Sequence, residues 1–165
     1  MKKIILLIML VSYSIAIDFN FKEKNLDKFD IQGFSSKVIY KNKIDRDRQI
    51  GNLWDKFLNS KLFDLKKSED KKLYVVYSNY KSNSFDCFIG IKPKGKLLKS
   101  EQKMIPKSDY FTTTLNYKKD MNMSSTWDDI LKQKLKRNYK LDIEQYAIID
   151  LQKNNYLINI YLSRD

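Results

Sequence analysis

The side chains available for chemistry in this 165-residue sequence are carboxylates, phenols, lysines and one thiol, because the chain has no histidine and a single cysteine, Cys87. The lack of histidine excludes a Ser-His-Asp triad, a Cys-His pair, an imidazole acid or base, and a metal site with histidine ligands. One cysteine cannot close an internal disulfide. We therefore expect no metal and no cofactor, and any chemistry must rest on carboxylates, phenols, lysines or Cys87.

Glu144 has the most unusual setting of the carboxylates. It lies in residues 143–149, an apolar run that predicts a strand, and shares one face of that strand with Tyr146 and Ile148. If this face is buried, the carboxylate must be protonated, hydrogen-bonded by tyrosines or paired with a bound cation. The alternative is a surface glutamate that pairs with a lysine of a neighbouring strand.

Cys87 lies in a segment where apolar and other residues alternate, which predicts a strand. Phe85, Ile89 and Ile91 share its face. Because an apolar environment raises the pKa of a thiol and blocks access to it, we expect a buried core thiol. Pairing between two molecules through Cys87 is the alternative.

The elements that must position these side chains occur in the same order twice. In the first half, residues 34–40 predict a strand and residues 73–77 and 85–91 predict a hairpin with a turn at 81–84. Between them, an apolar stripe with helical spacing predicts a helix whose stripe faces the core: Ile50, Leu53, Trp54, Phe57 and Leu58.

After a linker at 93–103, the second half predicts a strand at 110–115 and a helix with Ser125 as its N-cap and Asp128 in capping-box register. A strand at 143–149, a turn at 152–155 and a closing strand at 156–162 follow. The apolar face of the second helix consists of Trp127, Ile130, Leu131 and Leu135.

The two halves superpose with a nearly constant offset, since Trp54 and Trp127 differ by 73 positions and Tyr74 and Tyr146 by 72. This indicates a duplication. We expect an α+β fold in which two strand-helix-strand-strand units, residues 33–93 and 104–163, form an antiparallel or mixed sheet with both helices on one face. A ligand groove is expected between the halves. The alternative is two unrelated α+β repeats without a groove.

The N-terminus predicts export. Residues 1–16 have a short basic start, an apolar run of eight residues and small residues near the end, which is typical of a signal peptide. We expect residues 17–32 to be a loosely held lead-in and residues 33–165 to form one domain. The apolar run is too short for a permanent anchor, so we expect a periplasmic or secreted protein without a stable membrane anchor after cleavage. An uncleaved N-terminal anchor is the alternative.

The formal charge of +12, from 32 Lys+Arg against 20 Asp+Glu, would suit a polyanion or membrane surface. The excess is nearly all lysine and is scattered along the chain, which favours a solvated surface. We expect no DNA binding. A closed two-unit sheet needs no partner, so we expect a monomer or weak dimer.

These segments together resemble the GyrI-like effector-binding domain, the ligand-sensing module of multidrug-responsive transcription regulators, which also occurs as a stand-alone protein. The resemblance covers about residues 33–162. Its order and spacing are carried by Ile50, Leu53-Trp54, Phe57, Tyr74-Val75-Val76-Tyr77, Phe88-Ile89-Gly90, Ile105-Pro106, Tyr110, Trp127, Ile130, Ile143-Glu144-Gln145-Tyr146 and Ile160-Tyr161-Leu162.

The resemblance implies a pocket between the halves, lined by aromatic residues, with a carboxylate at its base that suits flat, apolar or cationic molecules. Glu144 matches the pocket glutamate of the family. Trp127 matches the second-helix tryptophan, Tyr110 the tyrosine after the Ile-Pro pair, and Tyr146 the aromatic residue two positions after the glutamate. Tyr74 and Tyr77 complete the candidate site, and we expect one of the two to face the groove and the other the core.

Two functions are consistent with these residues. The first is an exported protein that binds a small apolar or cationic aromatic molecule. The second is a hydrolase of small molecules, in which Glu144 would act as base or nucleophile. Because the sequence contains no histidine and no metal cluster, it favours binding over catalysis.

Overall fold

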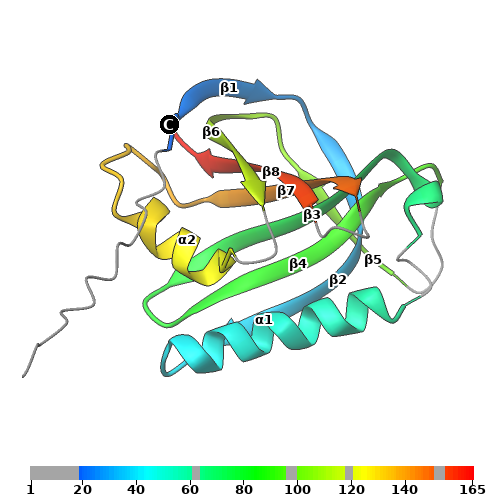
Figure 1. Ribbon diagram of the computed structural model, residues 1–165, viewed down its shortest axis with the longest axis horizontal. Helices are drawn as coiled ribbons and strands as arrows, with labels where there is room; N and C mark the ends of the chain where they lie inside the picture. Colours follow the sequence, from blue (N-terminus) through cyan, green and yellow to red (C-terminus); the bar gives the residue numbers. More distant parts are fainter. Residues whose placement is uncertain (1–18, 61–63, 96–99, 118–120, 151–154) are drawn as a thin grey trace, which may run out of the picture.

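The computed structural model describes residues 19–60, 64–95, 100–117, 121–150 and 155–165 (Figure 1). The expected signal peptide, 1–16, lies outside the described residues, as does most of the expected turn at 152–155. Within the part of the chain that is described, no helix has the length and apolar character that a membrane crossing requires.

The protein is an α+β fold built on one curled, eight-stranded sheet in the order β1-β6-β8-β7-β3-β4-β2-β5. Neighbouring strands pair in antiparallel fashion, so of the two expected arrangements the sheet is antiparallel. The strands are β1 (Lys22–Leu26), β2 (Phe29–Ile39), β3 (Ser68–Lys81), β4 (Ser84–Pro93), β5 (Glu101–Ile105), β6 (Ser108–Tyr117), β7 (Leu141–Asp150) and β8 (Asn155–Ser163).

Helix α1 (Lys43–Leu58) follows the predicted apolar stripe, with Leu53 and Phe57 buried against the sheet. The Asn42 side chain caps its first turn by accepting a hydrogen bond from the backbone N–H of Asp45 (2.9 Å). A short 3₁₀ helix, η1 (Leu65–Lys67), leads into β3.

Helix α2 (Met123–Leu131) begins earlier than the sequence predicted. Its N-cap is Asn122, whose side chain accepts a hydrogen bond from the backbone N–H of Ser125 (3.2 Å), so Ser125 lies inside the first turn. Asparagine and serine are equally good caps, and propensity alone does not choose between them. The helix ends at Leu131, which places Leu135 in the following loop.

Two segments expected to be irregular are edge strands. β1 lies within the expected lead-in, 17–32, and pairs with β6, and β2 already begins at Phe29. β5 lies partly within the expected linker, 93–103, and pairs with β2. Most β1 and β5 side chains are exposed, and exposed edge strands often carry charged residues. Such strands therefore lack the alternation of apolar and polar residues from which a strand is predicted.

The sheet separates two apolar layers. Val75, Tyr77, Cys87 and Ile89 lie in the layer on the side of the helices, and Cys87 is fully buried there, as expected of a core thiol. The opposite face carries a second cluster: Ile31, Tyr74, Val76, Phe88, Ile105, Tyr110, Ile143 and Tyr161. Figure 1 shows both helices beside one face of the sheet, and the sheet curls so that its opposite face encloses the second cluster.

The strand-helix-strand-strand order appears twice, as β2-α1-β3-β4 and as β6-α2-β7-β8. The first set lies in the sheet as β3-β4-β2 and the second as β7-β8-β6, with β3 and β7 adjacent at the centre. Tyr74 and Tyr146, which the sequence superposes, lie on opposite faces of the sheet.

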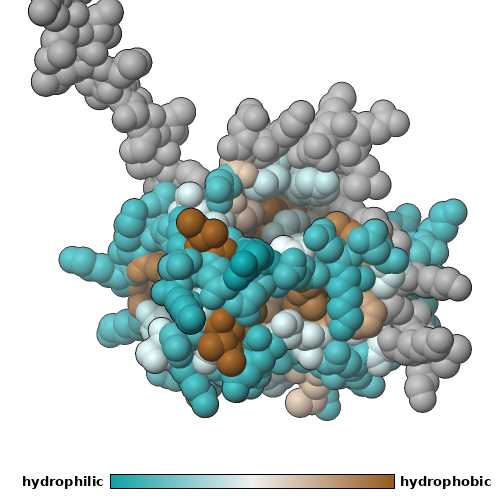
Figure 2. Space-filling model, turned by 90° about the horizontal axis from the view of Figure 1, so that it is seen from below, coloured by the Kyte–Doolittle hydropathy of each residue, from teal (hydrophilic) through white to brown (hydrophobic). Residues whose placement is uncertain are grey.

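The outer surface is mainly hydrophilic, as Figure 2 shows for the side on which α1 lies. Its hydrophobic groups are separate, and the exposed large apolar residues near α1 are Ile39, Ile44 and Leu58. The lysine-rich composition therefore falls on the solvated surface rather than in the two apolar layers.

Candidate functional site

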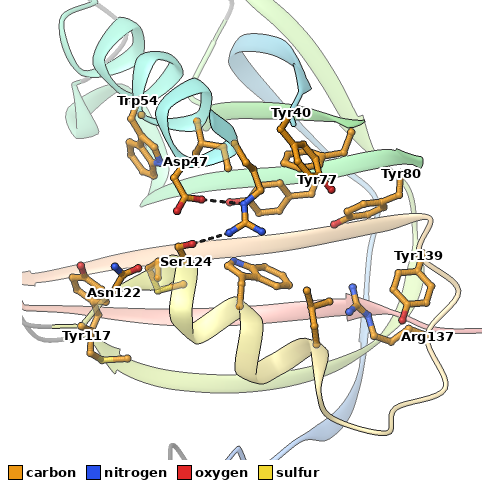
Figure 3. A pocket seen from close by; sticks show the side chains of 18 residues that line it. Tyr40, Asp47, Trp54, Tyr77, Tyr80, Tyr117, Asn122, Ser124, Arg137 and Tyr139 are labelled. Carbon is orange, nitrogen blue, oxygen red and sulfur yellow. Dashed lines mark hydrogen bonds and ion pairs between the residues drawn. The ribbon is translucent and has the colours of Figure 1, made fainter. Parts of the chain in front are cut away.

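A cavity of about 610 Å³ opens between α1, α2 and the helix-side face of the sheet. This volume is within the range of small-molecule sites, which is about 300–1,000 Å³. Residues of both strand-helix-strand-strand sets contribute to its wall, and Figure 3 shows side chains from α1, from α2 and from the strands converging on it.

Eight of the 18 residues that line the cavity are aromatic. Tyr77 of β3 packs edge-to-face against Trp127 of α2, with 5.5 Å between ring centroids and an interplanar angle of 78°. Trp54 of α1 lines the cavity nearby and makes a similar contact with Tyr146, at 5.5 Å and 82°. Because edge-to-face pairs fix one another, these rings form a rigid surface for a flat or cationic ligand.

Glu144 lies directly behind this aromatic wall and is only 2% exposed. Its Oε1 accepts hydrogen bonds from Tyr77 Oη (3.0 Å) and from Trp127 Nε1, and its Oε2 accepts one from Tyr146 Oη (2.6 Å). The donors come from β3, α2 and β7. The carboxylate does not line the cavity itself, but Tyr77 and Trp127 touch both the carboxylate and the cavity.

Burial raises the pKa of Glu144 above that of an ordinary glutamate, while the hydrogen bonds from Tyr146, Trp127 and Tyr77 oppose the rise. Burial, followed by the proximity of Glu144, raises the pKa of Tyr77 and Tyr146. Both phenols therefore remain protonated and act as donors. The three hydrogen bonds therefore offset part of the cost of ionising Glu144 just beneath the cavity surface.

Arg46 lies on the cavity side of α1, four residues before Ile50 and eight before Trp54. Its Nε donates to Asp47 Oδ1 (3.0 Å) and its Nη2 donates across the cavity to Ser124 Oγ of α2 (2.7 Å). The two dashed lines in Figure 3 mark these contacts. Lys43 and Asp128 form a second link between the helices at 2.5 Å.

A buried ion pair closes one end of the cavity. Arg137 donates to Asp142, which also accepts from Tyr80 Oη (2.6 Å) and from the backbone N–H of Ser163 (3.0 Å). The Arg137 guanidinium stacks on the ring of Tyr139, 4.5 Å from its centroid. Tyr139 has a φ of 55°, a conformation that costs a bulky residue about 1–3 kcal/mol and is often found at functional sites.

The structure unites four of the six predicted site residues. Tyr77 and Trp127 line the cavity, and Glu144 and Tyr146 lie behind them. Tyr74 and Tyr77 divide between core and cavity as expected. Tyr74 lies in the core on the opposite face of the sheet, because a separation of three positions from Tyr77 reverses its direction, so it is no longer a candidate site residue.

Tyr110 is also a correction. It is fully buried in the layer on the far side of the sheet, packed edge-to-face on Tyr161, and does not line the cavity. Burial, followed by the nearby Asp142, raises its pKa to about 12. Among the described residues its hydroxyl has no hydrogen-bond partner.

Sequence reasoning missed several cavity residues, among them Arg46, Tyr80, Arg137 and Tyr139. A signal existed for Arg46, since its spacing from Ile50 and Trp54 places it on the same helical face. Tyr80 lies within a register irregularity of β3 between Ser78 and Lys81, and simple alternation does not predict which face such a residue occupies. No cluster of potential metal ligands occurs within the described ranges.

The curled antiparallel sheet, the helices on one face and the aromatic cavity define a GyrI-like effector-binding fold. The family described as integron-associated effector-binding protein (Cass2) matches residues 24–163, and the chain belongs to this family. The match begins before residue 33, so it includes part of the segment expected to be a lead-in. No curated protein sequence matches the chain.

Several solved structures share the fold. An integron cassette protein from the mobile metagenome of Vibrio cholerae superposes with a TM-score of 0.68 at 22% identity, covering 88% of this chain and 96% of that chain. The protein SAV2435 bound to tetraphenylphosphonium gives 0.70 at 12% identity, with 88% and 94% covered. A putative bacterial transcription regulation protein from Staphylococcus aureus MU50 gives 0.69 at 12%, with 88% and 98% covered.

Proposed function

We propose that this protein binds small apolar or cationic aromatic molecules in the cavity between its two strand-helix-strand-strand sets. The observation that carries the proposal is the Glu144 carboxylate, held by three donors directly behind the aromatic rings that face the cavity. A cation over a desolvated aromatic face gains about 0.5–2 kcal/mol per ring. The charge of Glu144 adds to this attraction through Tyr77 and Trp127.

The geometry favours binding over turnover. A nucleophile or general base must reach the substrate directly or through one water. Both Glu144 oxygens already accept hydrogen bonds, and the carboxylate is covered by Tyr77 and Trp127 on the side of the cavity. Its role is therefore to supply negative potential and to fix the rings.

SAV2435, which shares the fold, is bound to tetraphenylphosphonium, and that ion is a suitable first probe for this chain. The decisive comparison uses phenyltrimethylammonium and its neutral isostere tert-butylbenzene. Trp54 and Trp127 both line the cavity, so quenching of tryptophan fluorescence reports binding. We expect the wild-type protein to bind the cation more tightly than the isostere.

The variant Glu144→Gln should reduce that preference to the part supplied by the aromatic faces and leave the affinity for tert-butylbenzene unchanged. Glutamine fits because its amide oxygen can accept from Tyr77 and Trp127, while its amide NH₂ donates to the hydroxyl of Tyr146. Equal losses for cation and isostere would exclude a role for the charge of Glu144.

The two-set architecture supports an origin by duplication, with the ligand site at the seam where β3 meets β7. The antiparallel strand orders β3-β4-β2 and β7-β8-β6 are what a duplicated unit would give. The superposition of Tyr74 on Tyr146 is not the correct register, because equivalent residues must face the same side of the sheet.

We further propose that the protein is exported and acts as a monomer or weak dimer that does not bind DNA. The signal-like composition of residues 1–16 supports export, and an intact-mass measurement of the protein from its own cell envelope, expected to lack those residues, tests it. Light scattering tests the oligomeric state. Retention of ligand affinity at high salt would separate cavity binding from polyanion binding.

A further inference from the structure

Two arginines line the cavity, and they differ in whether their charge is paired with a buried carboxylate. Arg137 is committed to the buried Asp142, with side chains only 3% and 0% exposed, and its guanidinium stacks on Tyr139. Its charge is therefore compensated inside the protein. Arg46 has no comparable partner.

The Arg46 side chain is 19% exposed, and its acidic partner is Asp47, the next residue in the chain, whose side chain is 36% exposed. Its other partner, the Ser124 hydroxyl, is uncharged. A guanidinium carries five N–H donors, and these two contacts use one on Nε and one on Nη2. Within the described residues no acceptor is found for the remaining three, although the guanidinium lies in the cavity.

The position of this guanidinium is not explained by packing. Ile50 and Trp54 continue the same helical face with apolar side chains, and an apolar residue in place of Arg46 would avoid the cost of removing a charge from water. The contact with Ser124 instead holds the guanidinium between the two helices. A planar donor fork held in a cavity is the group that recognises a carboxylate or similar oxyanion by paired hydrogen bonds.

We propose that Arg46 is a specificity-determining residue that binds a carboxylate or comparable oxyanion on the aromatic ligand of this cavity. The inference rests on the proposed function, because the same ligand lies with its aromatic part on Trp54, Tyr77 and Trp127. The preferred ligands are accordingly aromatic acids and zwitterions that combine a flat or cationic body with an anionic group.

The test uses four probes that separate the two charges. Phenyltrimethylammonium and tert-butylbenzene are compared with the same molecules bearing a ring carboxylate, namely trimethylammoniobenzoate and tert-butylbenzoate, taking the better of the meta and para isomers. Each is titrated into the wild-type protein and into Arg46→Gln. We expect the carboxylate to tighten binding to the wild-type protein by about tenfold, as expected for a hydrogen-bonded charged group.

In Arg46→Gln this gain, measured as the affinity of each carboxylate relative to its own parent in the same variant, should disappear. The affinity of phenyltrimethylammonium itself should rise, because a positive charge has been removed from the cavity. The matched control is Arg48→Gln, on the same helix, whose side chain is 70% exposed and lies outside the cavity wall. This control should keep the full gain. Arg46→Lys, which keeps the charge and loses the fork, should keep part of it, and it provides the comparison if Arg46→Gln does not fold.

The outcomes distinguish the two proposals. If carboxylates bind the wild-type protein no more tightly than their parents, or if their gain survives in Arg46→Gln, the Arg46 subsite is refuted even where the cation preference holds. If Arg46 only ties α1 to α2, the substitution changes all four affinities by the same factor, which also refutes it. A carboxylate gain without a cation preference would instead refute the role of Glu144. No binding by any probe would overturn both proposals.

Discussion

If the cavity binds cations as we propose, the buried carboxylate should make their binding depend on pH in a defined direction. Burial raises the pKa of Glu144 in the free protein, and a bound cation stabilises the ionised form and lowers that pKa again. Cation affinity should therefore rise with pH and level off above the pKa of Glu144 in the free protein. Below it, binding must release a proton, and affinity should fall by about tenfold per pH unit.

The magnitude follows from the contacts of the carboxylate. Three hydrogen bonds to a charged group contribute about 1.5–3 kcal/mol each, or about 5–9 kcal/mol together. Removing one ion from water costs several kcal/mol in a folded protein. Burial is the larger of the two contributions, and the hydrogen bonds oppose it, so the ionised state is disfavoured in the free protein and the positive charge of a ligand favours it.

The assay is isothermal titration calorimetry with phenyltrimethylammonium over a range of pH, repeated in two buffers with different ionisation enthalpies to count released protons. Tyr77, Tyr146 and Cys87 face Glu144, and burial raises the pKa of all three, so they stay protonated in this range. Asp142 is also buried with a raised pKa, but it lies at the Arg137 end of the cavity. The same titration of Glu144→Gln separates the contribution of Glu144 from that of Asp142.

Two results would refute this reasoning. One is a cation affinity that does not change with pH while no protons are released. The other is the same slope in Glu144→Gln as in the wild-type protein, which would assign the titration to another group. The neutral isostere should show no slope in either protein.

Three further predictions concern stability. Burial raises the pKa of Glu144 above its value in the unfolded chain, so the stability that Glu144 contributes is fully present below the unfolded pKa and is lost as pH rises through the folded pKa. In urea unfolding, the wild-type protein should therefore lose stability relative to Glu144→Gln over that pH range. A difference in unfolding free energy that stays constant with pH would contradict this. Tyr110→Phe removes a buried hydroxyl without a partner among the described residues, so it should raise the unfolding free energy by about 1 kcal/mol without changing ligand affinity, and a loss of affinity would return Tyr110 to the site. Gly33→Ala should lower the unfolding free energy by more than about 3 kcal/mol, because the new Cβ would lie 1.8 Å from the backbone oxygen of Ile89. Gly51→Ala, whose Cβ would have no atom within 4 Å, should stabilise α1 by about 1 kcal/mol. Thermal unfolding checks both variants, and similar stability changes in the two would contradict the close approach of β2 and β4.

The sequence predicted the elements with strong periodicity. The stripe of α1, the hairpin β3-β4 and the strand that carries Glu144 and Tyr146 all follow from apolar spacing, which reflects burial on one side. β1 and β5 could not be predicted in this way, because most of their side chains are exposed and their pairing depends on β6 and β2.

Within the site, the sequence identified the carboxylate and its nearest rings, but not the charged rim. The sequence divided Tyr74 and Tyr77 between core and groove but did not say which faces which. The superposition of Tyr74 on Tyr146 is a separate error of register, because the odd positions of β3, such as Tyr77, face the helices, whereas in β7 the even positions, such as Glu144, do so. Equivalent positions of β3 and β7 must therefore be separated by an odd number of residues in the sequence. Arg137 and Tyr139 lie in a loop whose path depends on Asp142, and no local pattern predicts it.

The location of Glu144 connects the site to the architecture. Glu144 pairs with Val75 across the β3–β7 boundary, where the two strand-helix-strand-strand sets meet. Tyr77 reaches its carboxylate from one set, and Trp127 and Tyr146 reach it from the other. Since hydrogen bonds to an ionised acceptor are stronger than those to a neutral one, a ligand that keeps Glu144 ionised also tightens the contacts between the sets. We therefore expect ligand binding and the rigidity of this seam to be coupled through the charge of Glu144.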